Sequence, residues 1–164
     1  MYITKEEYCE IYDSVDDKTF NRLEYEARRV MDKYTTGVDG IKKLRQFFPQ
    51  DEENTEAVKY CAAKLIHILI QLQNAETAAT QGRGYETTEM GMRGKTIKTI
   101  SSGNESISFS SEADGAATVI DAAVADKDVM DRLLADTVRE GLAGIKDSNG
   151  VNLLYMGTYP RRRV

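Results

Sequence analysis

Metal-binding and disulfide-forming residues are scarce in this sequence, which has one histidine and two cysteines among 164 residues. Cys9 and Cys61 form no Cys-x-x-Cys motif and no cluster with histidine, as a zinc site requires. Both fall on apolar faces of expected helices, so we expect buried, reduced thiols. The single histidine, His67, is interpreted as a surface or interface residue. We predict no metal and no cofactor.

Long hydrophobic runs are also absent. No apolar stretch approaches the roughly 20 residues that span a bilayer. The opening residues, MYITKEEYCEIYD, lack the basic region and the apolar run of a secretory signal. We therefore expect a protein with no membrane segment that is made in the cytoplasm.

An excess of positive charge, with which most nucleic-acid-binding proteins neutralise phosphates, is missing. The sequence has 22 Lys and Arg against 27 Asp and Glu, a formal net charge of −5 and a pI near 5.0. This balance argues against a general nucleic-acid binder. It also fits a channel wall past which DNA slides without sticking. Composition alone does not choose between these interpretations.

Recognisable catalytic arrangements are lacking as well. Gly94, Lys95 and Thr96 match the end of the phosphate-binding pattern G-x-x-x-x-G-K-[ST]. However, the first glycine of that pattern falls on Glu89, and a strand pattern follows where a helix is required. The carboxylates lie at solvated helix starts, with no second acid in an apolar setting to separate their pKa values. We therefore do not expect an enzyme.

What the sequence does contain is helical periodicity in its first half. Thr4 precedes a short amphipathic helix and is a candidate N-cap. Asp16 or Asp17 begins a longer helix, whose apolar residues recur at helical spacing up to Gly37. These patterns predict two consecutive helices that each bury one face.

Two further helices complete the predicted bundle. Asn54 or Thr55 is expected to cap a long helix that forms the centre of the core, and the last helix is expected at about 125–143. The fold class is therefore mainly α: one domain over 1–164, with a small helical bundle at about 4–80 and 122–145. It carries an inserted β-hairpin and an extended C-terminal arm.

A glycine-rich loop and a β-hairpin are predicted between the helices, at about 81–111. β-branched residues flank the turn-forming Ser102, Gly103 and Asn104. An isolated hairpin is only marginally stable in water. We therefore expect it to meet another subunit or to line a channel.

The C-terminal arm, at about 150–164, combines apolar, aromatic and basic residues. Aromatic and arginine side chains are enriched in the parts of interfaces that contribute most to binding. The docking residues that we predict are Leu153, Leu154, Tyr155, Tyr159, Arg161, Arg162 and Arg163. The three arginines alone also fit a nucleic-acid patch or a disordered, solubilising end.

The order of these motifs resembles a known family. The hairpin IKTISSGNESISFS is similar to a stretch of tailed-phage head-to-tail connector proteins, also called adaptors or head-completion proteins. FNRLEYEARRVMDKYTTG resembles the first long helix of that family, and NLLYMGTY resembles its Leu-Leu-Tyr-Arg-Gly ending, with Met156 in place of Arg. The hairpin residues that carry the likeness are Ile97, Lys98, Gly103, Ser106, Ile107, Ser108 and Phe109.

The resemblance implies a structural virion protein. Such subunits form a ring, typically twelve-fold, between the portal and the stopper or tail-completion protein in the virion neck, and DNA passes through the ring. The resemblance also implies that the C-terminal arm docks on the portal. On this basis, deletion of residues 152–164 is expected to abolish portal binding and to leave the helices folded.

Two other functions stay open. A DNA-packaging accessory protein, similar to a small terminase, also forms a helical ring; here the tail or Arg83, Arg93, Lys95 and Lys98 would contact DNA. Its DNA binding would weaken steeply with salt. The other alternative is a small helical enzyme with substrate in the glycine-rich loop, for which the sequence offers no convergent polar groups.

Overall fold

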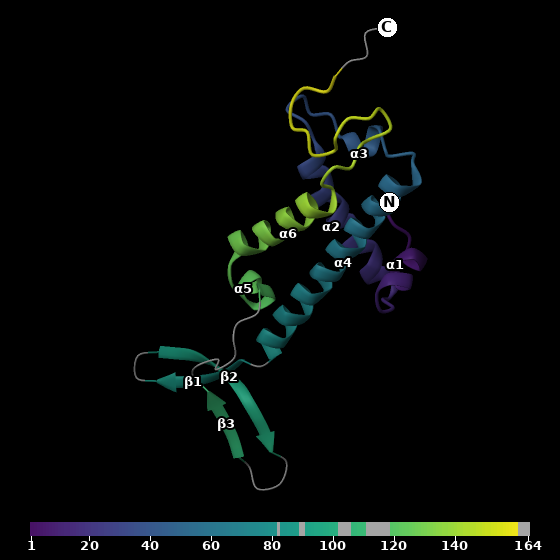
Figure 1. The fold of residues 1–164 in the computed structure, drawn as a ribbon. Helices are drawn as coiled ribbons and strands as arrows, with labels where there is room; N and C mark the ends of the chain where they lie inside the picture. Colours follow the sequence, from purple (N-terminus) through teal and green to yellow (C-terminus); the bar gives the residue numbers. More distant parts are fainter. Residues whose placement is uncertain (82, 89–90, 102–105, 111–118, 161–164) are drawn as a thin grey trace. The chain divides into compact units, whose positions relative to one another are not determined.

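The computed structural model describes residues 1–81, 83–88, 91–101, 106–110 and 119–160, and the side chains of residues 1–77 and 119–160. The described chain is mainly helical, as the sequence predicted. It divides into two compact units. Unit 1 comprises Met1–Ile70 and Asp131–Val164, and unit 2 comprises Gln71–Met130. Figure 1 shows the order of the elements.

The first two helices of unit 1 begin at the caps that the sequence indicated. Helix α1 spans Lys5–Ile11, and Thr4 with Glu7 forms a reciprocal capping box at its start. Helix α2 spans Asp17–Thr35, and the Asp16 carboxylate accepts a hydrogen bond from the Thr19 amide. The predicted apolar stripe of α2 is confirmed, since its core-facing residues are buried: Phe20, Leu23, Ala27 and Met31.

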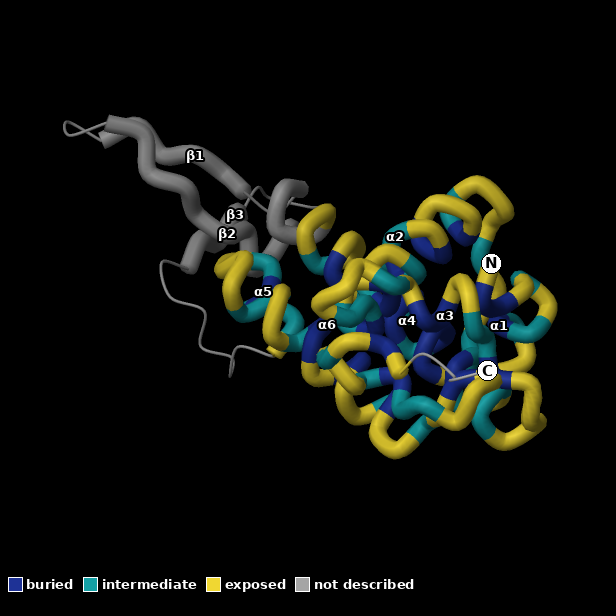
Figure 2. The backbone as a smooth tube through the Cα atoms, turned by 90° about the horizontal axis from the view of Figure 1, so that it is seen from above, coloured by how far each residue is buried: buried dark blue, intermediate teal, exposed yellow. Residues whose placement is uncertain are grey.

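Helix α4, Glu52–Gln81, supplies the centre of the unit 1 core up to Ile70. Its Val58, Cys61 and Leu65 are all at most 1% exposed, and Figure 2 shows this buried stretch in dark blue. The predicted caps Asn54 and Thr55 are wrong. The helix begins earlier, because the Asp51 carboxylate already accepts a hydrogen bond from the Asn54 amide at 2.9 Å.

A close approach of two helices completes this core. Helix α6 spans Lys127–Gly141, and a Cβ added at Gly141 would lie 2.8 Å from Sγ of Cys61 and 3.0 Å from its Cβ. Cys61 also lies 4.0 Å from the Thr137 carbonyl oxygen. Glycine at position 141 therefore lets the helix backbone lie directly against α4.

Replacement of Gly141 by alanine tests this approach. We expect Gly141→Ala to lower the free energy of unfolding by about 1–3 kcal/mol, since overpacking forces neighbouring atoms apart. Chemical denaturation measures the change. The double variant Cys61→Ala/Gly141→Ala removes the colliding sulfur, so its loss should be smaller than the sum of the two single losses. Additive losses would show that the sulfur is not the obstacle.

The buried Cys61 thiol predicts a dependence of stability on pH. Burial raises the pKa of Cys61 to about 12, so the folded chain keeps a proton that the unfolded chain releases above about pH 9. The stabilising contribution is therefore complete at lower pH and is lost as pH rises toward 12.

Denaturation of wild type and Cys61→Ala at two pH values isolates this contribution from tyrosine ionisation, which both proteins share. The difference in unfolding free energy between them should shrink by about 2 kcal/mol from about pH 8 to about pH 10.5. A constant difference would contradict the prediction. Cys9 is only half-buried and both thiols are free, so the expectation of two buried thiols is confirmed for Cys61 alone.

The last helix that the sequence predicted at about 125–143 is confirmed as α6, and a shorter helix that the sequence did not predict precedes it. Helix α5 spans Val119–Ala125 and α6 follows from Lys127. The break occurs at Asp126, whose carboxylate accepts a hydrogen bond from the Asp128 amide at 2.8 Å. An aspartate with this bond caps a new helix, and the sequence pattern did not distinguish it from a helix-interior residue.

Unit 2 also contains three antiparallel strands, β1 at Arg83–Thr88, β2 at Gly91–Ser101 and β3 at Ser106–Ser110. Their order is β1-β2-β3, and Ile97 pairs with Phe109 across β2 and β3. The turn of the expected hairpin, including Gly103, lies outside the described residues. So do the side chains of its other expected contact residues, and the inserted hairpin stays a prediction.

Candidate functional site

The C-terminal segment 143–160 packs onto the chain that follows α2 and onto the short helix α3, Lys43–Gln46. Figure 1 shows this segment in yellow beside α3. Backbone hydrogen bonds join Val38 to Met156 at 3.0 Å and Ser148 to Phe47 at 3.1 Å. The end of the described chain is therefore part of the unit 1 fold.

This region contains two turns with the same arrangement of bridge and glycine, one after α2 and one after α6. One is closed by an isolated bridge between Thr36 and Lys42, the other by a bridge between Lys146 and Asn152. Gly40 and Gly150 occupy equivalent places with φ near +75° and +80°, where a side chain is disfavoured. The sequence carries a signal for this pairing that the sequence analysis missed: each glycine is followed by a β-branched apolar residue, and a leucine lies three positions beyond that residue.

Asp147 organises the second turn from a nearly buried position, with 4% exposure. Its Oδ1 accepts hydrogen bonds from the amides of Asn149 and Val151, both at 2.9 Å. Its Oδ2 accepts the Tyr159 hydroxyl at 2.7 Å. The carboxylate thus links the turn at 147–151 to the chain eight residues further on.

Tyr159 is held from several directions. Its ring stacks on Phe47 at 4.7 Å between centroids, and its amide donates to Oδ2 of Asp39 at 2.7 Å. That backbone hydrogen bond lowers the pKa of Asp39. The Asn149 amide group also donates to the Tyr159 hydroxyl at 2.9 Å. These contacts fix residues 147–159 as a closed loop.

Lys43 adds a buried cation beneath the same loop, with 1% exposure. Its Nζ donates to the carbonyl oxygens of Tyr155 and, at 3.4 Å, of Asn152, and it lies 5.8 Å from the centroid of the Tyr155 ring. Burial lowers the pKa of Lys43, while the nearby carboxylates of Asp147 and Asp39 oppose that change. The sequence patterns did not predict this buried lysine, because nothing in its neighbourhood along the chain marks it as buried.

The predicted extended arm is therefore wrong for its described part. Leu153 has 0% exposure and Tyr159 has 9%, so neither side chain is free to dock on a partner. The turn after α6 folds the chain back, and the leucine fills the core of its own subunit. Arg161, Arg162 and Arg163 lie outside the described residues.

Of the other predicted docking residues, Tyr155 stays accessible, next to two exposed residues that were not predicted to dock. Tyr155 and Met156 are each 49% exposed, and Val38, whose amide donates to the Met156 carbonyl, is 76% exposed. Leu154 is half-buried. We call Val38, Tyr155 and Met156 the C-terminal apolar patch. Because the loop beneath them is closed by Asp147 and Lys43, these side chains are held outward on a fixed backbone.

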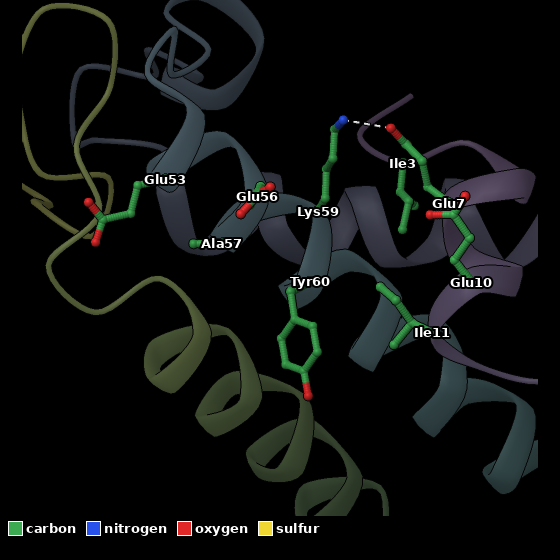
Figure 3. Close-up of a pocket in the computed structure, with 9 residues that line it drawn as sticks. All are labelled: Ile3, Glu7, Glu10, Ile11, Glu53, Glu56, Ala57, Lys59 and Tyr60. Atoms are coloured by element: carbon green, nitrogen blue, oxygen red, sulfur yellow. Dashed lines mark hydrogen bonds and ion pairs between the residues drawn. The ribbon is translucent and has the colours of Figure 1, made fainter.

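A groove of about 570 Å³ lies between α1 and α4. Figure 3 shows its lining, with an ion pair of 2.6 Å between Lys59 and Glu7. The hydrogen bond from Lys59 lowers the pKa of Glu7. We call this hollow the acidic groove; its lining residues are Ile3, Glu7, Glu10, Ile11, Glu53, Glu56, Ala57, Lys59 and Tyr60.

A surface of opposite charge lies on α2, on α3 and on the chain between them. Arg45 pairs with Asp32 at 2.8 Å there, and Lys33 lies 5.3 Å from the Tyr34 ring. The surface lines a hollow of about 380 Å³. We call it the basic face, and define it as Arg29, Lys33, Lys42 and Arg45 with the exposed ring of Tyr25.

Within residues 1–77 and 119–160, no three His, Cys, Asp or Glu side chains are grouped as a metal site requires. None of the helices described is long and apolar enough to cross a bilayer. Comparison of the chain with protein families, with curated proteins and with solved structures found no match.

Proposed function

We propose that this protein is a non-enzymatic structural connector, which forms a ring between the portal and the stopper or tail of a tailed phage. In that position, in the virion neck, it completes the head after DNA packaging and provides a conduit for DNA. The proposal rests on the order of the hairpin and tail motifs in the sequence and on one structural observation, the C-terminal apolar patch.

The C-terminal apolar patch supports docking on a larger assembly. Exposed side chains on a backbone that is already ordered need no further backbone ordering on binding. Tyr155 and Met156 precede Arg161–Arg163 by only a few residues in the sequence. An apolar contact followed by three cations suits a portal surface with acidic side chains around an apolar groove. In this form of the proposal, Leu153 and Tyr159 shape the docking loop from within.

The remaining parts of the proposal concern unit 2 and the net charge. The hairpin at 97–110 meets a neighbouring subunit or lines the channel. Its expected contacts are Ile97, Lys98, Gly103, Ser106, Ile107 and Phe109. A net charge of −5 suits a lumen through which DNA slides, because acidic walls do not retain phosphates.

Electron microscopy of the protein mixed with portal rings from its own gene neighbourhood tests the proposal. A collar of added density beneath the portal is expected. The variant Val38→Glu/Met156→Glu alters only exposed side chains and should lose the collar. The matched control, Ser14→Glu/Asn21→Glu, adds the same charge at exposed positions and should keep it. Absence of a collar with the wild-type protein would contradict the connector function.

The basic face supports a second candidate, a DNA-packaging accessory protein. Arg29 and Lys42 are exposed and form no ion pair with any described residue, so both are available for phosphates. Duplex binding that weakens steeply with salt, together with no portal collar, would favour this candidate. The connector function predicts little DNA binding at physiological ionic strength.

A further inference from the structure

We propose that the acidic groove is a subunit interface, in which the basic face of a second copy of this chain docks. The inference deepens the proposed connector function and rests on it for the ring. It identifies the surfaces through which neighbouring subunits of that ring make contact.

The acidic groove has an apolar centre that is open to a partner. Ile11 and Tyr60 are 42% and 55% exposed at its walls, and Ile3, with 1% exposure, also lines it. Figure 3 shows Ile11 on α1 and Tyr60 on α4. Neighbouring exposed apolar side chains with polar groups around them are typical of protein interfaces. A tyrosine here provides contact area with few rotatable bonds.

The charge around this centre favours a cationic partner. Lys59 neutralises Glu7, whereas Glu10, Glu53 and Glu56 are exposed and form no ion pair with any residue whose side chain is described. Three uncompensated carboxylates beside an apolar centre repel acidic surfaces and attract basic ones. The groove would therefore repel most other surfaces of this chain, because the chain is acidic overall.

The basic face supplies the complementary surface on the same chain. It presents four cations, of which only Arg45 is paired with a described carboxylate, and Tyr25 adds a ring with 51% exposure. Tyr25, Arg29 and Lys33 follow one another at four-residue spacing, on the side of α2 opposite the buried stripe. A second copy can thus place an aromatic ring and several cations against the apolar centre and its carboxylates.

The two surfaces lie on different elements and share no residue. A single contact between them is therefore heterologous, with the groove of one subunit against the face of the next, and the pair of subunits keeps one free groove and one free face. Contacts of this type continue from subunit to subunit until a ring closes. A two-fold symmetric dimer would instead require both groove-to-face contacts to form within one pair of subunits.

Sedimentation velocity of the full chain over a range of concentrations tests the proposal. At about 50 mM salt we expect species larger than a monomer, and at about 500 mM salt we expect weaker association, because screening acts on exposed charges. Glu10→Lys/Glu56→Lys reverses the groove, and Arg29→Glu/Lys33→Glu reverses the face. Each should raise the dissociation constant at least about tenfold.

Two controls separate the interface from general charge effects. Asp136→Lys/Glu140→Lys makes the same change in net charge as the groove-reversed variant, but at exposed positions of α6. It should leave association unchanged. A mixture of the groove-reversed and face-reversed proteins retains one native pair of surfaces, and should form a 1:1 complex at concentrations where each protein alone is monomeric.

Each outcome decides a separate question. A wild-type protein that stays monomeric at every concentration, or unchanged association in both reversed variants, would overturn the interface. Dimers that survive groove reversal would show that the chain associates through a different surface. If the face-reversed protein lost DNA binding but kept its association, that face would be assigned to nucleic acid. A collar on portal rings without self-association would refute only this interface, and self-association without a collar would refute only the connector function.

Discussion

Leu153→Ala is expected to lower the free energy of unfolding by about 2–5 kcal/mol, as truncation of fully buried leucines does. Leu153 has 0% exposure, and its amide donates to the Ile145 carbonyl at 2.9 Å. Removal of its side chain leaves a cavity at the point where the C-terminal loop joins the core. Chemical denaturation followed by circular dichroism measures the loss.

Leu154→Ala is the matched control, since this adjacent leucine is only half-buried. This variant should lose distinctly less stability than Leu153→Ala. Equal losses in the two variants would contradict the burial of Leu153.

Deletion of residues 152–164 should also destabilise unit 1, because it removes Leu153, Tyr159 and the carbonyl partners of Lys43. This result is contrary to the expectation from the resemblance, in which the helices stay folded. Loss of portal binding in that deletion would therefore not by itself identify the docking residues.

Asp147→Ala is expected to lower the free energy of unfolding by about 3 kcal/mol, because it removes an acceptor of three hydrogen bonds from a nearly buried turn. The amides of Asn149 and Val151 then lose their partner, and an unpaired buried donor is costly. Limited proteolysis should also cut the loop 147–160 faster in the variant than in the wild type.

Tyr159→Phe separates the two roles of the Asp147 carboxylate, which accepts from the turn amides and from the Tyr159 hydroxyl. It removes the hydroxyl that Asp147 and Asn149 hold and keeps the ring that stacks on Phe47. Its expected cost is about 1 kcal/mol, well below that of Asp147→Ala. If the two variants lost equal stability, the turn amides would contribute nothing and the closed loop would depend on the hydroxyl alone.

The beginnings of the first two helices could be predicted because their causes are local. Thr4 and Asp16 lie next to the amides that they cap, and the apolar stripe of α2 recurs within a few residues. Where two local signals competed, the prediction failed. Asp51 rather than Asn54 or Thr55 begins α4, since Asp, Asn and Thr are all common in caps and turns alike.

The candidate surfaces depend on pairs of segments that are distant along the chain. Tyr155 and Tyr159 read alike in the sequence, yet the Tyr155 side chain is half-exposed and that of Tyr159 is 9% exposed. The difference arises because Asp39, Phe47 and Asp147 surround Tyr159. No local pattern carries that information.

Local sequence thus decided the mainly helical fold, the caps of α1 and α2 and the apolar stripes, since hydrogen bonding and periodicity act over a few residues. Tertiary structure alone decided that residues 150–160 close onto the fold and do not extend from it. It also decided that glutamates of α1 and α4 converge on one groove while cations of α2 gather elsewhere. The physical reason is that burial and charge complementarity are properties of surfaces, which exist only once distant segments have packed together.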